Sequence, residues 1–300
     1  MSLLPTRPTC CFACASALLA GCALPAWAQE GPQDALAAPA PPAEAAPAAA
    51  RSSATPTHFV AGLLVSSSPK YAGGEGRSTS LRPAWAIEHG RFRLSTARGS
   101  AIMGHGLAAV DIGSGVSAAL IDQDRWRLRA SLLVDNGRDE GDGPRLVGLP
   151  KVRSTLRARL GLGYAITQRW GLGLSVAQDI LDRAGGAQWS ASMGYTMPVT
   201  QQTSLNFGVG AGWGDKTFMR THYGVPASAA PRSPLPTFAP DAGFYSIDAG
   251  IDAMTALHHS WVLFGGLHVA QLQGDARRSP ITVRPTSFSA SIGLAYRCCR

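Results

Sequence analysis

The stretch SLRPAWAIEHGRFRLS, residues 80–95, decides the fold. Apolar side chains occupy alternate positions from Leu81 to Ile87, and arginine and alanine fill the positions between them. Successive side chains of a β-strand point to opposite faces, so this pattern gives one apolar face and one charged or small face. The alternation stops at His89-Gly90 and then resumes, which predicts a hairpin. Pro83 lacks a backbone donor and predicts a bulge in the first strand of that hairpin.

The same two-residue alternation recurs to the end of the chain. Twelve candidate strands begin near residues 57, 79, 91, 107, 125, 151, 170, 186, 203, 244, 261 and 286. Most of them run for about 10 residues, which is the length that a tilted strand needs to cross a bilayer. In this interpretation the apolar faces meet lipid and the charged faces line a lumen.

The connections between these strands alternate in length. Short ones follow the even-numbered strands, as at 88–90 and 258–260, and longer ones generally follow the odd-numbered strands, as at 135–150 and 214–243. This asymmetry and the even strand number are typical of outer-membrane barrels. The sequence therefore predicts an all-β fold: an antiparallel transmembrane β-barrel of about 12 strands, with short periplasmic turns and longer extracellular loops. A soluble β-sandwich, which also wets one face of each strand, is the alternative.

Four tryptophans favour the barrel over the sandwich. They lie near the short turns and share the parity of the apolar rows: Trp85, Trp126, Trp170 and Trp261. Tryptophan is enriched where a membrane meets water. We therefore expect these side chains to be lipid-interface aromatics.

The first 56 residues are expected to lie outside the barrel. Residues 1–28 have the features of a secretory signal peptide, with cleavage between Ala28 and Gln29. A lipobox-like sequence offers acylation of Cys22 as the alternative. Residues 29–56, rich in Ala and Pro, are expected to be a disordered tether, which leaves 57–300 for the barrel. We expect export through the periplasm and insertion into the outer membrane.

The charge balance bears on the partners. The chain has 27 Lys and Arg against 19 Asp and Glu, a formal net charge of +8. In an exported protein this balance favours anionic partners such as lipopolysaccharide and other outer-membrane lipid, and export argues against nucleic acid. Four of the six cysteines lie in the first 28 residues, so the sequence does not indicate a disulfide framework.

Charged side chains predict the lining of the lumen. They are assigned to the parity opposite to the apolar rows, and arginine outnumbers the acids: Arg82, Arg91, Arg93, Arg125, Arg127, Arg129, Arg153, Arg157, Arg159, Glu88, Asp111, Asp135, Asp179, Asp248 and Asp252. Unpaired charges in a confined space are costly, so a paired structural network is the favoured interpretation. An anion-attracting pore built on the excess arginine is the alternative.

The sequence does not predict a catalytic or metal site. The seven histidines are scattered and lack the tight spacing of zinc ligands. A rim enzyme built on His105 and His222 with loop acids is conceivable, but nothing in the spacing fixes its geometry. We therefore expect no catalytic residue, no metal and no cofactor.

The longest connection, residues 214–244, is a candidate binding surface. Its aromatic residues Phe218, Tyr223 and Phe238 and its many prolines predict a semi-rigid loop that folds over or into the barrel mouth.

Four segments occur in order along the chain: SPKYAGGEGRSTSLRPAWAIEHGRFRLS (68–95), DNGRDEGDGPRLVGL (135–149), GDKTFMRTHYGV (214–225) and FSASIGLAYR (288–297). Together they resemble the MipA/OmpV family, the MltA-interacting protein type of outer-membrane protein. The resemblance covers roughly residues 57–297. One departure is the end of the chain, where Cys298-Cys299-Arg300 follow Tyr296 and Arg297 in place of a terminal aromatic residue.

The resemblance implies a function as well as a fold. It implies a barrel that is inserted by the barrel assembly machinery and that acts as a non-enzymatic scaffold for peptidoglycan-remodelling enzymes. The implied partners are a murein lytic transglycosylase and a penicillin-binding protein, and the family supplies no catalytic residues. A small porin-like channel with a basic lumen is the alternative hypothesis, and a rim-located hydrolase is the third.

Overall fold

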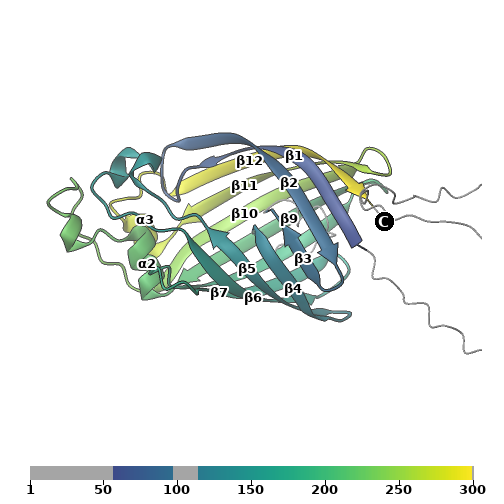
Figure 1. The fold of residues 1–300 in the computed structure, drawn as a ribbon, viewed down its shortest axis with the longest axis horizontal. Helices are drawn as coiled ribbons and strands as arrows, with labels where there is room; N and C mark the ends of the chain where they lie inside the picture. The colour runs from purple at the N-terminus through teal and green to yellow at the C-terminus, as the bar shows by residue number, and fades with distance from the viewer. Residues whose placement is uncertain (1–56, 97–113, 299–300) are drawn as a thin grey trace, which may run out of the picture. The chain divides into compact units, whose positions relative to one another are not determined.

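A computed structural model of the chain describes residues 57–96 and 114–298. Within this part of the chain twelve antiparallel strands form a closed barrel, in which each strand pairs with its sequence neighbours and the first pairs with the last (Figure 1). The strands are β1 (Thr57–Pro69), β2 (Arg77–His89), β3 (Phe92–Ser95), β4 (Gly115–Asp122), β5 (Trp126–Asp135), β6 (Thr155–Ala165), β7 (Trp170–Asp179), β8 (Ala187–Pro198), β9 (Thr203–Gly214), β10 (Gly243–Ala256), β11 (Trp261–Leu272) and β12 (Thr286–Cys298). The predicted fold class is confirmed.

The two ends of the barrel differ as the sequence predicts. Short turns follow β2, β4, β6, β8 and β10, at the end where β1 begins and β12 finishes; we call this the turn end. Longer connections lie at the opposite end, the loop end, and hold the short helices η2 (Glu140–Asp142), η3 (Pro144–Leu146), α2 (Lys216–Tyr223), η4 (Ala227–Ala229) and α3 (Gly274–Arg278). In Figure 1 α2 and α3 lie at the end of the barrel away from the C-terminus.

Most strand boundaries agree with the alternation pattern. The strand expected from near residue 107 is described from Gly115 on, because residues 97–113 lie outside the described ranges. Two further expectations need correction. The strand expected near residue 151 begins only at Thr155, because Val152 forms a bridge with Arg138 inside the preceding loop. Pro83 causes no bulge: it lies opposite Leu63 in an unbroken register with β1. On its other side the described pairing with β3 covers only Ala86 to His89, so the missing donor interrupts no described ladder.

The outer face of the barrel is apolar. Leu81, Leu267 and Phe288 expose 65, 66 and 61% of their surface, and the other outward positions of the strands carry mainly Leu, Val, Ile and aromatic residues. Large exposed apolar side chains over a whole surface would be costly in water, and they fit a lipid environment.

The inner face divides into an apolar part and a small, polar part. Near the closure of the barrel, inward side chains from β1, β2, β11 and β12 form a buried cluster of Val60, Leu64, Ala84, Val262, Phe264 and Ala295. Glycine and serine dominate the inward positions of β7, β8 and β9. The apolar cluster fills the interior beside β1, β2, β11 and β12, whereas the short side chains of β7, β8 and β9 leave space on the other side.

Candidate functional site

The loops at the loop end pack into a cap with its own hydrophobic core. Its members come from four different connections, which lie far apart in the sequence: Tyr71, Leu146, Leu149, Val225, Ala229, Leu235 and Ile281, with Phe238 packed against them. Two backbone hydrogen bonds between Val225 and Phe238 stabilise the conformation of the longest loop. The described loops therefore form a packed structure rather than separate tethers.

Helix α2 anchors this cap to the barrel wall. Asp215 caps the helix by accepting a hydrogen bond from the Phe218 amide at 2.6 Å. The helix then buries Phe218, Met219 and Tyr223 against α3, against Leu272 of β11 and against Tyr245 of β10. As the aromatic residues of this loop predict, it folds over the barrel mouth, and Phe218 and Tyr223 are the side chains that attach it.

Arg157 lies beneath α2 and joins the cap to the strands. Its Nε donates to Asp135 Oδ2 at 2.8 Å, and its two Nη atoms donate to the carbonyls of Gly186 (3.1 Å) and Gly185 (2.9 Å). Its guanidinium carbon lies 5.5 Å from the centre of the Phe218 ring, within the range of a cation–π interaction. Gly186 adopts a φ of 62°, a conformation that glycine permits without strain.

Asp179 orders the loop that supplies these carbonyls. Its carboxylate accepts backbone hydrogen bonds from Leu181 (3.0 Å), Arg183 (2.7 Å) and Gly185 (2.8 Å), and a further one from the hydroxyl of Thr155. Asp135 and Asp179, both expected in the lumen network, thus act at the mouth, where they connect strands to loops.

His222 of α2 completes the polar cluster under the cap. Its Nε2 lies 3.5 Å from Arg157 Nη2, and its ring packs on Phe218 with 4.5 Å between centroids. Burial lowers the pKa of His222 to about 4; the nearby charges of Arg138 and Arg157 add to the shift, and the Asp135 carboxylate opposes it. The imidazole is therefore neutral at physiological pH.

The other arginines expected in the lumen fall into three groups. Arg93 is paired with Glu88 at 2.6 Å, Arg127 with Asp122 at 3.4 Å, and Arg82 donates to the Ser80 hydroxyl at 2.8 Å. Arg129 and Arg159 lie at inward positions of β5 and β6 and are half-buried.

Three of the arginines lie outside the strands, which corrects the sequence expectation. Arg91 and Arg125 are exposed in turns at the turn end, because β3 and β5 each begin one residue later. Arg153 is exposed in the loop before β6. Asp111 lies outside the described residues, as do His105, Ala28, Gln29 and Cys22.

The remaining acids lie on the opposite wall from the arginines of β5 and β6. Asp252 of β10 contacts His268 of β11, with 3.1 Å between Oδ1 and Nε2. Both side chains lie against the wall: a Cβ added at Gly250 would collide with His268 Nδ1, and one added at Gly266 would collide with Asp252 Oδ1. Asp248 is inward on β10 beside Gly210. The described lumen thus has a basic side and an acidic side.

The glycine-rich wall leaves open space within the barrel. A Cβ added at Gly208 of β9 would meet no atom within 4 Å. Inward side chains nearby are short and form hydrogen bonds between neighbouring strands. The Ser175 and Ser190 hydroxyls lie 2.8 Å apart, and the Thr196 hydroxyl donates to Asn206 Oδ1 at 2.9 Å.

Aromatic pairs occupy the turn end of the outer face. Each of three tryptophans lies directly opposite a tyrosine on the neighbouring strand: Trp126 with Tyr164, Trp170 with Tyr195 and Trp261 with Tyr296, with ring centroids 4.5, 4.7 and 5.5 Å apart. Trp85 lies at an outward position of β2 and is half-buried. The three tyrosines were not predicted as partners of the tryptophans, although their positions near the turns could have indicated them.

Sequence reasoning also missed Gly185, Gly186 and the joint role of Phe218 and His222. No pattern in the sequence indicates that these loop residues meet at Arg157, because the contact depends on how the β7–β8 and β9–β10 connections pack against β6. Within the described ranges no helix is long and apolar enough to cross a membrane. The same ranges contain no group of three His, Cys, Asp or Glu residues placed to hold a metal ion.

The barrel is closed, and it has an apolar outer face, aromatic pairs near its turn end and a polar inner wall. These features define the class of protein as a transmembrane β-barrel of the outer-membrane type. Residues 61–298 match the family described as MltA-interacting protein MipA. The chain belongs to this family.

Solved structures offer only distant likenesses. The NanC porin aligns at 9% identity with a TM-score of 0.41, covering 79% of this chain and all of that one. The outer membrane channel DcaP of Acinetobacter baumannii aligns at 8% identity with a TM-score of 0.37, covering 81% of this chain and 97% of that one. No curated protein sequence matches the chain.

Proposed function

We propose that this protein is a non-enzymatic outer-membrane scaffold that binds peptidoglycan-remodelling enzymes. The observation that carries the proposal is the match of residues 61–298 to a family described by its interaction with a second protein, MltA. The partner classes are a murein lytic transglycosylase and a penicillin-binding protein. Both act on the cell wall, so in this proposal the turn end faces them across the periplasm.

The packing of the cap supports a structural role for the lumen charges. Arg157, Arg93 and Arg127 each have an acidic partner, and Arg157 also donates to two carbonyls of the loop at the mouth. Arg157 thereby fixes the cap to the wall, and an arginine with an acidic partner contributes less to the attraction of passing anions.

The turn end offers a basic surface for a partner. Arg91, Arg125 and Arg169 are exposed in three different turns, within the part of the barrel that lies nearest the aromatic pairs. Such exposed charges at the rim of an interface mainly accelerate association and respond to salt. We propose that these arginines contact an acidic patch on the partner enzyme.

The test is a binding measurement on the folded barrel in lipid nanodiscs, with a purified lytic transglycosylase and a purified penicillin-binding protein from the same cell. The triple variant R91E/R125E/R169E is expected to bind about tenfold more weakly. The matched control is R145E/R153E, which changes exposed loop arginines at the opposite end and should bind normally. Absence of binding by the unaltered barrel, or equal weakening in the control, would overturn the proposal.

A small porin-like channel is the second candidate, and the open space at Gly208 favours it. Single-channel conductance of the refolded barrel separates the two functions. A steady conductance with anion preference would make transport the leading function, whereas a silent bilayer with well-folded protein would exclude an open pore. A rim hydrolase has less support, because the His222 imidazole is engaged with Arg157 and packs on the Phe218 ring.

A further inference from the structure

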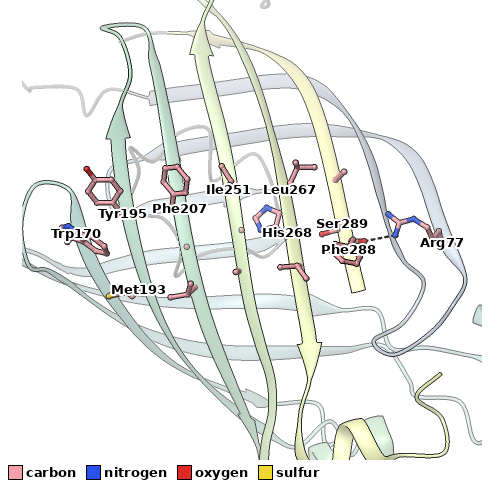
Figure 2. A pocket seen from close by; sticks show the side chains of 16 residues that line it. Arg77, Trp170, Met193, Tyr195, Phe207, Ile251, Leu267, His268, Phe288 and Ser289 are labelled. Carbon is pink, nitrogen blue, oxygen red and sulfur yellow. Dashed lines mark hydrogen bonds between the residues drawn. The ribbon is translucent and has the colours of Figure 1, made fainter. Parts of the chain in front are cut away.

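A hollow of about 750 Å³ crosses the outer face of the barrel from β7 to β2. Its lining is almost wholly apolar, and most of its residues sit at outward positions of their strands, among them Tyr195, Phe207, Ile251, Leu267 and Phe288 (Figure 2). The hollow therefore belongs to the surface that faces lipid, not to the lumen.

Small residues between large ones create this hollow. Ala249 of β10 lies opposite Val209 on one side and Val269 on the other, and Ala290 of β12, also outward, lies opposite Leu267 of β11. Larger side chains rise at both ends, with Trp170 and Tyr195 at one and Phe288 at the other (Figure 2). A flexible apolar chain would fill this space and regain the contacts that an open surface lacks.

The hollow runs obliquely between the two ends of the barrel. Trp170 is the first residue of β7 after a short turn, so it marks the turn end. Arg77 is the first residue of β2 after a longer loop, so it marks the loop end. Figure 2 shows Trp170 and Arg77 at opposite sides of the hollow, and outward side chains of β8, β9, β10, β11 and β12 lie between them.

Arg77 is a fixed cation at the loop end of the hollow. Its Nη1 donates to the Phe288 carbonyl at 2.9 Å, and its Nε and Nη2 donate to the Ser67 hydroxyl at 3.2 and 3.1 Å. Thr79 donates to the same hydroxyl, so the outward face of β1 and β2 becomes polar here. Among the described residues no carboxylate lies within ion-pair distance of Arg77.

A second exposed cation lies on the adjoining loop. Arg284 is exposed, and its backbone amide donates to the Gly73 carbonyl at 3.0 Å, which ties its loop to the one that precedes Arg77. The backbone of Arg284 thus lies against the loop that leads into Arg77, near the place where the apolar surface gives way to a polar one.

We propose that this hollow binds a membrane lipid with a phosphate headgroup. One acyl chain lies in the hollow over Ala290 and Ala249, and the phosphate meets Arg77, with Arg284 beside it. Guanidinium groups are suited to phosphate because their planar donors match two of its oxygens, and their charge strengthens each bond. The lipid belongs to the leaflet at the loop end. This site does not depend on the protein partner proposed above.

The test is native mass spectrometry of the detergent-solubilised folded barrel with three probes. Dioleoyl phosphatidic acid has both the chains and the phosphate, dioleoylglycerol has only the chains, and inorganic phosphate has only the headgroup. We expect phosphatidic acid to bind at least about tenfold more tightly than either of the others, because a hydrogen bond to a charged group contributes about that factor.

Three variants locate the site. Arg77→Gln should weaken phosphatidic acid about tenfold and leave dioleoylglycerol unchanged, and Ala249→Trp should weaken both lipids by filling the hollow. Arg82→Gln is the matched control, because Arg82 lies on the same strand but at an inward position. Equal binding of phosphatidic acid and dioleoylglycerol by the unaltered barrel would overturn the proposal, whether or not the variants fold. So would equal loss in Arg77→Gln and Arg82→Gln.

Discussion

Arg157 shows how one side chain connects parts of the chain that are distant in sequence. It comes from β6, and it binds an acid at the end of β5, two carbonyls of the β7–β8 loop and the aromatic face of α2. A buried charge is stable only when all its donors are engaged. The fixed geometry of the cap supplies these partners, and Arg157 in turn holds the cap in place.

Replacing Arg157 by Met should destabilise the barrel strongly. The change leaves the Asp135 carboxylate and the carbonyls of Gly185 and Gly186 without their donor, which for a broken buried pair costs about 3–5 kcal/mol. Urea unfolding in detergent measures the loss. Arg127→Met is the control, since its pair with Asp122 is about half exposed and should contribute less than about 1 kcal/mol. Similar losses in both variants would contradict a special role for Arg157.

His222 should make the stability depend on pH. Its folded-state pKa of about 4 lies below the ordinary value of 6.5, so the unfolded chain takes up this proton first as the pH falls. The contribution of His222 to the free energy of unfolding is constant above about pH 6.5, declines between about pH 6.5 and 4, and levels off below. In the declining range the free energy of unfolding changes by up to about 1.4 kcal/mol per pH unit.

The comparison of the unaltered protein with His222→Gln isolates this effect. Melting temperatures at pH 7, 6, 5 and 4.5 should fall more steeply for the unaltered protein than for the variant. Parallel curves would show that His222 is not buried in its neutral form.

Helix α2 is the part of the cap that packs against the strands. The helix has only eight residues, too few to be stable alone in water. Its stability comes from the Asp215 cap and from burying Phe218, Met219 and Tyr223. Removing the buried side chains of α2 should therefore detach the β9–β10 loop from the barrel without disturbing the strands.

The double variant F218A/Y223A should raise the single-channel conductance relative to the unaltered barrel. Removing the two rings detaches α2 from Tyr245 and Leu272 and exposes the lumen at the mouth. Phe288→Ala is the control, because Phe288 lies on the outer face. An unchanged conductance with the strands intact would show that α2 does not limit access to the lumen.

At the scale of the whole molecule, the two faces of the barrel should respond in opposite ways to the same substitution. Leu267 is at the middle of β11 on the outer face, so Leu267→Arg should cost about 2–4 kcal/mol in a bilayer. Gly208→Arg places the same charge at an inward position beside open space and should cost much less. Refolding yields and urea midpoints in phospholipid vesicles measure both. Equal costs would argue against a lipid-facing outer surface.

The alternation in residues 80–95 and its repeats was enough to predict the strands, their two faces and the uneven ends of the barrel. These features depend on local periodicity, which a sequence displays directly. The partners of each charge could not be predicted in the same way. Arg157 contacts Gly185, Gly186 and His222 because of the way the loops pack. Three arginines lie outside the expected lumen because their strands begin later than the pattern indicated: Arg91, Arg125 and Arg153.

The apolar cluster inside β1, β2, β11 and β12 has a consequence for folding. The pairing of β1 with β12 joins residues at opposite ends of the described chain, such as Phe59 and Cys298. Closing so long a loop carries the largest entropic cost of any pairing in the barrel, so this seam is expected to form last. Val60, Leu64, Val262 and Ala295 become buried together only when it forms. Their burial supplies a driving force at the slowest step, and it makes reopening of the closed barrel at this seam a rare event.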